Sequence, residues 1–420
     1  MQFIDAFNPA FRTMGRIGES KNHLPLWVFP YTQARFRFTG TSLAVRLRNF
    51  WNYGHTRIGV IIDNTQFSVR VPSPVEPEPD AAVSVGEDGM LTIRIASHLP
   101  NIEHRAIVFK REDGGMHYME FAGVEIDDDA QILAPAEPAS TRRIEVYGDS
   151  VSCGERNEAV LCTGKADPDE DLSAYSNSWF AYDAIAARAL GADLRIISQG
   201  GAPLLDGIGW FNAPDYLGME SIWDRVQYNP ALGEPTDWDF RDDDPQVVIV
   251  ALGQNDSHPY DFMAADYTGE QAANWRARYA EFLGDLLERY PDAHIICTTT
   301  VLQHDRNWDR AIDEVVSELD NPQITHFDYS RAGTGTPGHP RIAEDEEMAR
   351  ELVAYIDSFG AEKVGWVGHR HWIASALYVP QPYPADLQGT TGTTHPLSDL
   401  TSEYPERLKQ VSSCRAEGQG

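Results

Sequence analysis

Four short segments of the chain carry residue types that can perform nucleophilic chemistry. A serine ends the tripeptide Gly148-Asp149-Ser150, two glycines stand together at Gly200-Gly201, an amide side chain lies in the run Gly253–Asp256, and an imidazole, His339, lies in the run TPGHP. A serine hydroxyl is a poor nucleophile until a base accepts its proton, and a neutral histidine near pH 7 suits that task. Peptide N–H groups and amide side chains can stabilise an oxyanion. These segments can act together only if the fold brings them to one place.

The first three segments each follow a predicted β-strand. The strands are RRIEVYG (142–148), ADLRIIS (192–198) and QVVIVAL (246–252), and the last is the continuous apolar type that is buried on both faces of a parallel sheet. Two further strands, AHIICTT and ITHFDY, follow. Active sites in such sheets lie beyond the carboxyl ends of the strands, which is where these segments fall.

Helices are predicted between the strands, over 178–190, 269–290 and 340–358, from apolar residues at helical spacing. Gly191 is placed to cap the first helix. Thr268 and Gln271 have the spacing of a capping box at the start of the second, and Pro291 marks its end. Alternating strands and helices predict an α/β domain with a mostly parallel sheet between two helical layers, as in flavodoxin-like folds.

The first third of the chain predicts β-structure instead. Phe36 and Phe38 alternate with Arg35 and Arg37, and RIGVIIDNTQFSVRV is expected to form a hairpin that turns at Asp63-Asn64. Many short strands without convincing helices indicate a β-sandwich or jelly roll. The segment APAEPAS (134–140) is a candidate linker. We therefore predict a β-sandwich domain over 1–140, an α/β domain over 141–360, and a C-terminal extension of unknown role over 361–420.

The four segments, in this order and at these predicted strand and helix ends, resemble the conserved blocks of the SGNH or GDSL hydrolases. A jelly roll joined to such a domain resembles carbohydrate esterase family 2, to whose blocks GDSVSCGE, WDFRDDDPQVVIVALGQND and GHPRIAEDEEMARELVAYI are similar. The likeness covers roughly residues 30–358. It implies a serine esterase that removes O-acetyl groups from carbohydrates of the acetylated xylan or mannan type.

The resemblance also implies a role for each residue of the blocks. Ser150 would be the nucleophile and His339 the base, and the oxyanion hole would be formed by the Ser150 N–H, the N–H of Gly201 or Gly200, and the side-chain amide of Asn255. Many members of the superfamily have an aspartate three residues before the histidine, where this chain has Thr336. We therefore expect a Ser-His dyad, with the carbonyl or hydroxyl of Thr336 as candidate support for the imidazole.

Other interpretations of these residues stay open. Ser150 and Asn255 could be ordinary turn residues, and His369 or His371, in the run GHRHW, could be the base or part of a metal site. Trp210 is a candidate for stacking on a sugar ring. At the level of function, the alternatives are a general GDSL-type hydrolase or lipase of small esters, and a carbohydrate-binding protein that has lost catalysis. Acyl chain-length preference would identify the first, and binding without acetate release the second.

Composition narrows the classes of partner. The formal net charge of -30 disfavours nucleic acid and anionic membranes, because both repel an acidic protein. No basic segment followed by an apolar run begins the chain, no apolar stretch is long enough to span a bilayer, and the four cysteines lack zinc-type spacing. We expect a cytoplasmic enzyme that uses no cofactor and no metal, whose substrate is an acetylated carbohydrate, and whose state of homo-oligomerisation is open.

Overall fold

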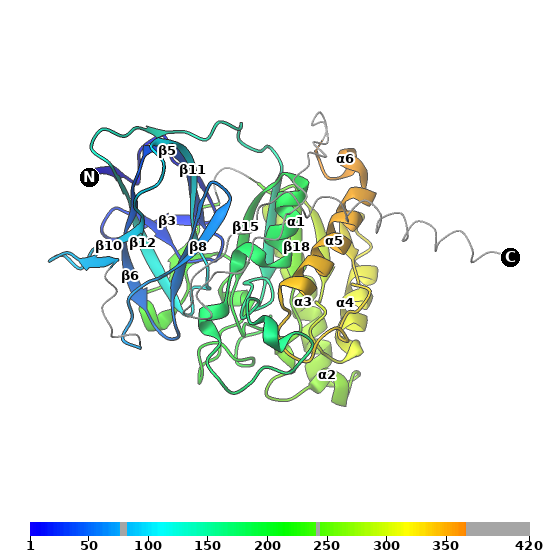
Figure 1. Ribbon diagram of the computed structural model, residues 1–420. Helices are drawn as coiled ribbons and strands as arrows, with labels where there is room; N and C mark the ends of the chain where they lie inside the picture. The colour runs from blue at the N-terminus through cyan, green and yellow to red at the C-terminus, as the bar shows by residue number, and fades with distance from the viewer. Residues whose placement is uncertain (76–81, 241–243, 367–420) are drawn as a thin grey trace. The chain divides into compact units, whose positions relative to one another are not determined.

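The computed structural model describes residues 1–75, 82–240 and 244–366, and all of them belong to one compact unit. Its N-terminal part is a sandwich of two antiparallel sheets (Figure 1). The first sheet has the order β3-β4-β12-β6-β10-β9, with β1 paired to β12, and the second has the order β13-β5-β11-β7-β8, with β2 paired to β5. The strands are β1 Gln2–Asp5, β2 Arg12–Met14, β3 Ile17–Glu19, β4 Pro25–Trp27, β5 Gln33–Gly40, β6 Leu43–Trp51, β7 Arg57–Ile62, β8 Thr65–Arg70, β9 Val83–Val85, β10 Leu91–Ala96, β11 Ile102–Lys110, β12 His117–Ile126 and β13 Ile132–Leu133.

Period-two alternation builds this sandwich as the sequence predicts. Phe36 and Phe38 of β5 are buried between the sheets, whereas Arg35 and Arg37 point to the other face. The β7–β8 hairpin turns at Asp63 and Asn64, whose φ angles of 49° and 70° are those of a two-residue hairpin turn.

The second part is built on a five-stranded sheet in which every neighbouring pair is parallel. Its order, β15-β14-β18-β19-β20, is 2-1-3-4-5 in chain order, which is the flavodoxin-like arrangement. The strands are β14 Arg143–Gly148, β15 Asp193–Ser198, β18 Val247–Ala251, β19 His294–Thr298 and β20 Ile324–His326, and a small ribbon pairs β16 Arg225–Gln227 with β17 Thr236–Asp237. The helices are α1 Tyr182–Leu190, α2 Phe262–Ala265, α3 Glu270–Arg289, α4 Arg306–Leu319, α5 Ile342–Ser358 and α6 Gly360–Lys363.

Two helical layers cover this sheet (Figure 1). Helices α1 and α5 pack together on one face, against a cluster that includes Val146 and Ile249. Helices α3 and α4 cover the other face, against a cluster that includes Val248 and Trp275. The predicted fold class, a β-sandwich followed by a three-layer α/β domain, is confirmed. No helix among the described residues has both the length and the apolarity of a membrane span.

The helix ends differ in detail from the sequence predictions. Gly191 caps α1 as predicted, with a φ of 63° and its N–H bonded to the carbonyl of Ala187. The expected capping box at α3 is wrong, because Gly269 is the N-cap and the Thr268 hydroxyl donates to Asp266 instead. Helix α4 was not predicted at all, although its buried side chains have helical spacing: Trp308, Ala311, Ile312 and Val315.

A buried ion pair joins the two parts of the molecule. Arg16, between β2 and β3, is fully buried, with its Nη2 3.4 Å from Oε1 of Glu145 on β14. Its Nη1 donates to the carbonyls of Trp223 and Arg225, at 2.6 and 2.9 Å. Burial alone would raise the pKa of Glu145, but the charges of Arg195 and Arg16 outweigh burial and hold this pKa below its ordinary value. These contacts of Arg16 therefore couple the stability of the two parts.

Replacing Arg16 by methionine should lower the free energy of unfolding by about 3 kcal/mol. This is the lower end of the range for breaking a buried ion pair, because Arg195 remains beside Glu145. Urea denaturation measures this loss. The control Arg278→Met, which removes two ion pairs at the surface, should cost less than about 1 kcal/mol. The pKa of Glu145 is lower in the folded protein than in the unfolded chain, where it is about 4.3. The stabilisation by the pair is therefore complete above about pH 4.3 and is lost as the pH falls through the pKa of Glu145 in the folded protein. Equal losses in the two variants would contradict a structural role for the pair.

Candidate active site

Three of the four segments meet at the carboxyl edge of the parallel sheet. In the register of the sheet, Gly148 at the end of β14 lies opposite Ser198 of β15 and Ala251 of β18. The segments that follow these strands therefore emerge side by side. From β14 the chain continues to β15 on one side of it and then to β18 on its other side. Open α/β sheets form their binding crevices at such a change of direction.

Ser150 lies in a tight turn that leads away from β14. The carbonyl of Asp149 accepts a hydrogen bond from the N–H of Cys153 (3.0 Å), and that of Ser150 accepts one from the N–H of Glu155 (2.9 Å). Gly148 is required by space, because a Cβ there would lie 2.3 Å from the hydroxyl of Ser152. The Ser150 side chain is nearly buried but faces no hydrogen-bond partner among the described residues. The turn therefore presents a hydroxyl that is available for reaction.

The carboxylate of Asp149 locks the third segment onto this turn. Its Oδ2 accepts hydrogen bonds from Nε2 of Gln254 (2.8 Å) and Nδ2 of Asn255 (3.1 Å). Burial raises the pKa of Asp149 to about 6, against the lowering effect of its hydrogen bonds. The second N–H of Asn255 donates to the carbonyl of Ala202 at 3.2 Å. To stabilise an oxyanion, this N–H of Asn255 must give up its hydrogen bond to Ala202 and donate to the substrate oxygen instead.

Asn255→Ala should reduce kcat for ester hydrolysis by about 10²–10³-fold, as expected when one oxyanion donor is removed, with little change in KM. Steady-state rates on a small aryl acetate measure both constants. A fall of less than fivefold would show that the amide does not reach the oxyanion.

The two glycines of the second segment are required for different reasons. Gly201 has a φ of +77°, and a Cβ there would lie 2.8 Å from Cβ of Trp210, whose N–H donates to the Gly201 carbonyl. A Cβ on Gly200 would lie 2.6 Å from Oε2 of Glu155 and 2.8 Å from Oδ2 of Asp113. Both positions leave backbone close to the site and free of side-chain bulk.

His339 has a carboxylate partner that the sequence did not reveal. Its Nδ1 is 2.5 Å from Oδ2 of Asp167, and its Nε2 is 3.9 Å from Oε2 of Glu155, at the end of the Ser150 turn. No hydrogen bond joins His339 to Ser150 among the described residues, but such bonds often tighten only when substrate binds. With Nδ1 engaged by Asp167, Nε2 is the ring nitrogen left on the side of Glu155 and the Ser150 turn.

The support of the imidazole differs from the one expected, while the Ser-His dyad itself stays a prediction. Thr336 does not support the imidazole: its carbonyl accepts from the N–H of Gln303 (2.8 Å), and its hydroxyl is buried without a partner among the described residues. The supporting carboxylate, Asp167, comes instead from the long connection between β14 and α1, 172 residues before the histidine. Gly338 permits this approach, because a Cβ there would lie 2.5 Å from the carbonyl of Lys165 and 2.8 Å from the N–H nitrogen of Asp167.

Asp167 is held as an anion by cations on both sides. Its Oδ2 also contacts Nη1 of Arg156 at 3.0 Å, and its Oδ1 accepts from Nη2 of the fully buried Arg341. Burial would raise the pKa of Asp167, but its bonds to His339 and Arg341 outweigh burial and place the pKa well below the ordinary range. A carboxylate that stays ionised is what orients an imidazole and stabilises its protonated form.

The β-sandwich contributes to the site through the connection between β11 and β12. The N–H of Gly115 in this connection donates to Oε1 of Gln199 at 2.8 Å, directly before the glycine pair. Oδ1 of Asp113 accepts from the N–H groups of Gly115 and Met116, which leaves its Oδ2 toward Gly200 and Glu155. Burial, and then the charge of Glu155, raise the pKa of Asp113. The sandwich thus contributes to the lining of the candidate site.

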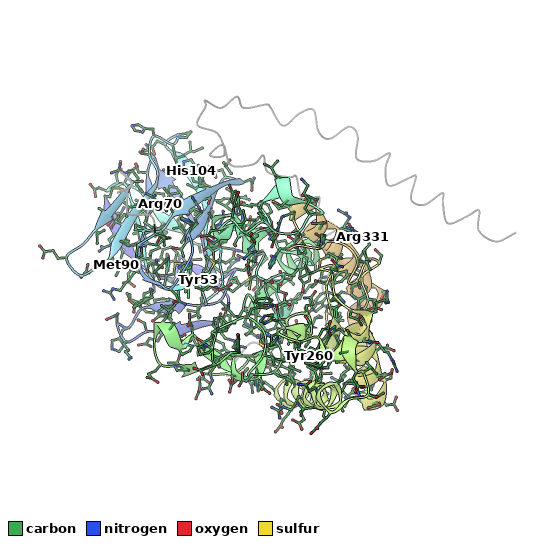
Figure 2. The ribbon with its side chains drawn as sticks, turned by 90° about the horizontal axis from the view of Figure 1, so that it is seen from below. Tyr53, Arg70, Met90, His104, Tyr260 and Arg331 are labelled. Atoms are coloured by element: carbon green, nitrogen blue, oxygen red, sulfur yellow. The ribbon has the colours of Figure 1, made fainter. Side chains whose placement is uncertain are left out.

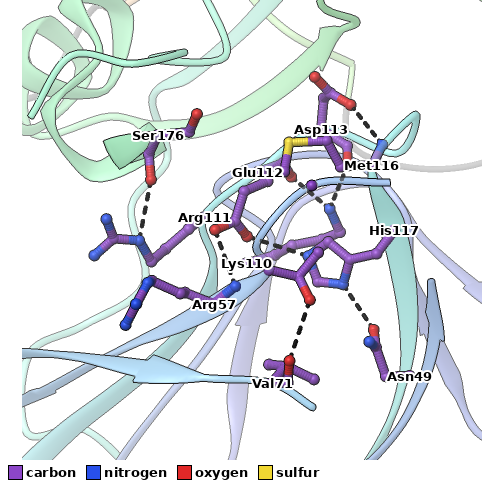
Figure 3. A network of polar contacts seen from close by, with 12 residues as sticks. Asn49, Arg57, Val71, Lys110, Arg111, Glu112, Asp113, Met116, His117 and Ser176 are labelled. Carbon is purple, nitrogen blue, oxygen red and sulfur yellow. Dashed lines mark hydrogen bonds and ion pairs between the residues drawn. The ribbon is translucent and has the colours of Figure 1, made fainter. Parts of the chain in front are cut away.

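A buried polar network fixes this connection in place (Figure 3). The ammonium of Lys110 donates to the carbonyls of Glu112 and Asp113, and burial lowers its pKa to about 8. Nε2 of His117 lies 3.1 Å from Oε2 of Glu112, whose pKa burial raises to about 8. Arg111 donates to the carbonyl of Ser176 in the α/β domain. The position of Asp113 is therefore set by both domains.

Two exposed aromatic side chains lie beside the site. Trp210 is 61% exposed, and one face of its indole stacks on His258, with ring centroids 3.4 Å apart. Tyr53 (Figure 2) is 45% exposed, yet burial around its hydroxyl and the charges of Asp113 and Glu155 raise its pKa well above the ordinary value. Both rings offer a face to a ligand. His369 and His371, the other candidate bases, lie outside the described residues.

The sheet order, the three segments at its carboxyl edge and the sandwich that precedes it give this chain an SGNH-type fold with a jelly-roll domain before it. Residues 13–136 match the family model described as carbohydrate esterase 2 N-terminal. The cellulase/esterase CelE of Acetivibrio thermocellus is 27% identical over 376 residues, which cover 87% of this chain and 41% of CelE. An acetylxylan esterase/glucomannan deacetylase of Cellvibrio japonicus is 25% identical over 358 residues, which cover 84% of this chain and 90% of that enzyme.

A solved structure extends this similarity. A family two carbohydrate esterase from Clostridium thermocellum, in complex with cellohexaose, matches with a TM-score of 0.65 and 25% identity, over 85% of this chain and all of that one. Within the SGNH class, this chain is thus a relative of the family 2 carbohydrate esterases, and the resemblance predicted from its sequence is confirmed.

Proposed function

We propose that this protein is a serine esterase that releases acetate from O-acetylated carbohydrates. The observation that carries the proposal is the Asp167–His339 pair, which leaves Nε2 of the imidazole facing the Ser150 turn. The relatives add the ester chemistry: they include an esterase and an acetylxylan esterase/glucomannan deacetylase.

The proposed reaction has two halves. In the first, the Ser150 oxygen attacks the acetyl carbonyl while Nε2 of His339 takes its proton, and the oxyanion is stabilised by the N–H groups of Ser150 and of Gly201 or Gly200 and by the amide of Asn255. The proton then passes from His339 to the departing sugar oxygen, which leaves the acetyl group on Ser150. In the second half, His339 takes a proton from water, whose oxygen attacks the acetyl-enzyme, and then returns that proton to Ser150 as acetate leaves.

A carbohydrate is the proposed alcohol part of the ester because of the aromatic faces beside the site. One face of the Trp210 indole stacks on His258, and the other is available to a sugar ring. Because the backbone N–H of Trp210 donates to the carbonyl of Gly201, a sugar ring stacked on this indole would lie near the oxyanion glycines. Carboxylates of Glu155 and Asp113 are suited to accept hydrogen bonds from sugar hydroxyls. The solved relative from Clostridium thermocellum is in complex with cellohexaose, which is an oligosaccharide like the proposed substrate.

Trp210→Ala should raise KM for acetylated xylo-oligosaccharides by about tenfold, equivalent to about 1.4 kcal/mol of lost binding, and leave hydrolysis of a small aryl acetate nearly unchanged. Acetate release measures the first and absorbance the second. Phe7→Ala, which removes a similarly exposed ring from the sandwich, is the control.

Three results would contradict parts of this proposal, and two of them would favour another function. Equal effects of Trp210→Ala on both substrates would remove the sugar-stacking role. A preference for longer acyl chains over acetyl would favour a general GDSL-type hydrolase. Binding to xylan without acetate release would favour a carbohydrate-binding protein.

A further inference from the structure

A cavity lies at the edge of the parallel sheet opposite the candidate active site. Its volume is about 820 Å³, and its lining includes Arg142 and Asp193, at the amino ends of β14 and β15, and Leu190 at the end of α1. Most of the remaining lining comes from β2, β5, β7 and β11 of the sandwich and from the segment 135–141. Ser150 follows the carboxyl end of β14, so the cavity and the candidate active site are separated by the length of a strand, on the order of 20 Å.

The lining of this cavity is strongly cationic in an acidic protein. Six arginines line it against only two carboxylates, Glu137 and Asp193, although the whole chain has a formal net charge of -30. Its six arginines are Arg12, Arg35, Arg37, Arg105, Arg142 and Arg188. Such a concentration of one charge in a concave site attracts ligands of the opposite charge.

Four of the arginines form two like-charged pairs across strands. Arg12 of β2 lies directly opposite Arg35 of β5, and Arg37 of β5 lies directly opposite Arg105 of β11. Arg35 and Arg37 are two residues apart, so all four occur on one face of the sheet. Like charges directly opposite each other destabilise a sheet, so the arrangement costs stability unless an anion neutralises it.

Carboxylates of the protein neutralise only part of this charge. Arg37 contacts Glu103 at 2.6 Å and Arg105 contacts Glu137 at 3.1 Å. Among the described residues, the side chain of Arg12 makes no hydrogen bond or ion pair, and the side chain of Arg35 donates only to the neutral amide oxygen of Gln33.

The arginines of the α/β domain form no ion pair with a carboxylate among the described residues, although the charge of Arg188 acts on Asp183. Arg142 donates to the carbonyl of Leu190 at 2.7 Å. Arg188 donates through Nη1 to the hydroxyl of Tyr31, and its Nη2 is buried without a partner. The cavity thus brings unneutralised guanidinium groups together from both domains.

We infer that this cavity is a second binding site, which takes a small molecule bearing two or more carboxylate or phosphate groups. Guanidinium groups bind such anions in bidentate geometry, which matches the paired arginines of β2, β5 and β11. A ligand in the cavity contacts residues of both domains, so it stabilises the folded state and raises Tm. The inference is independent of the proposed esterase activity.

The test is binding of two probes to the full chain by calorimetry and thermal shift at low salt: pyrophosphate and digalacturonate. Wild type should bind at least one of them, with a rise in Tm and with affinity that falls as sodium chloride is added. Binding of pyrophosphate alone identifies a phosphorylated ligand, and binding of digalacturonate alone identifies a carboxylated sugar. In the double variant Arg12→Gln/Arg35→Gln, affinity should fall at least tenfold, while unliganded Tm stays equal or rises because a like-charged pair is removed.

The control changes net charge by the same amount elsewhere. Arg278→Gln/Arg310→Gln removes two exposed arginines of α3 and α4 and should bind the probes as wild type does. Acetate release by Arg12→Gln/Arg35→Gln should match wild type, since neither residue lies in the candidate active site. The inference is overturned if wild type binds neither probe at millimolar concentration, or if the two double variants bind equally well.

Discussion

Ser150→Ala is expected to lower kcat for acetate release by about six orders of magnitude, the scale observed when the nucleophile of another serine hydrolase is removed. The alanine has no oxygen to form the acetyl-enzyme, so only the weak catalysis of the oxyanion hole and of binding remains. The fold should persist, because the Ser150 hydroxyl makes no hydrogen bond among the described residues. His339→Ala should be nearly as inactive, and the double variant no worse than either single one, because the two residues act as a unit.

The measurement is acetate release from acetylated xylo-oligosaccharides and from a small aryl acetate, with thermal unfolding as the check on folding. Ser152→Ala is the matched control in the same turn, since the hydroxyl of Ser152 faces the core and bonds to that of Tyr182 at 3.0 Å. It should affect stability more than rate. Activity above about 1% of wild type in Ser150→Ala would rule out Ser150 as the nucleophile.

Asp167→Asn is expected to lower kcat by about 10⁴-fold, the loss recorded for the equivalent change in another serine hydrolase. An amide that donates to Nδ1 of His339 would place the imidazole proton on Nε2, where the ring could no longer accept the serine proton. It would also leave Arg341, which is fully buried, without its anionic partner, so some loss of stability should accompany the loss of rate.

Initial rates on the aryl acetate between about pH 6 and 9, divided by the folded fraction from thermal unfolding, separate the loss of rate from the loss of stability. The corrected kcat should fall while KM changes little. Asp169→Asn, an exposed carboxylate in the same connection, is the matched control and should behave as wild type. If Asp167→Asn keeps kcat within tenfold of wild type at the same folded fraction, the chain works as the Ser-His dyad that its sequence suggested.

The parts of the site that were predictable are those with a local signal. Ser150, Gly200-Gly201 and Asn255 each follow an apolar run that forms a strand, so their meeting at one sheet edge follows from the parallel topology. Helix α4 also has such a signal in the spacing of Trp308, Ala311 and Ile312, although its many charged residues obscured it.

Asp167 and Asp113 have no local signal. Asp167 lies in an irregular connection rich in acidic residues, and only the packing of that connection against Gly338 distinguishes it from Asp169. Asp113 belongs to a turn between two strands of the other domain, and its place beside Gly200 depends on how the domains dock. Contacts of this kind depend on tertiary structure, which single-sequence patterns do not describe.

The docking of the β11–β12 connection also bears on how the protein matures. Gly115 holds Gln199 through a hydrogen bond, and Arg111 holds the carbonyl of Ser176, so residues made early in translation complete a site whose serine is made later. A chain that has folded only one of its halves therefore has an unfinished active site. Recovery of catalytic activity during refolding would report the joining of the two halves and not the folding of either one.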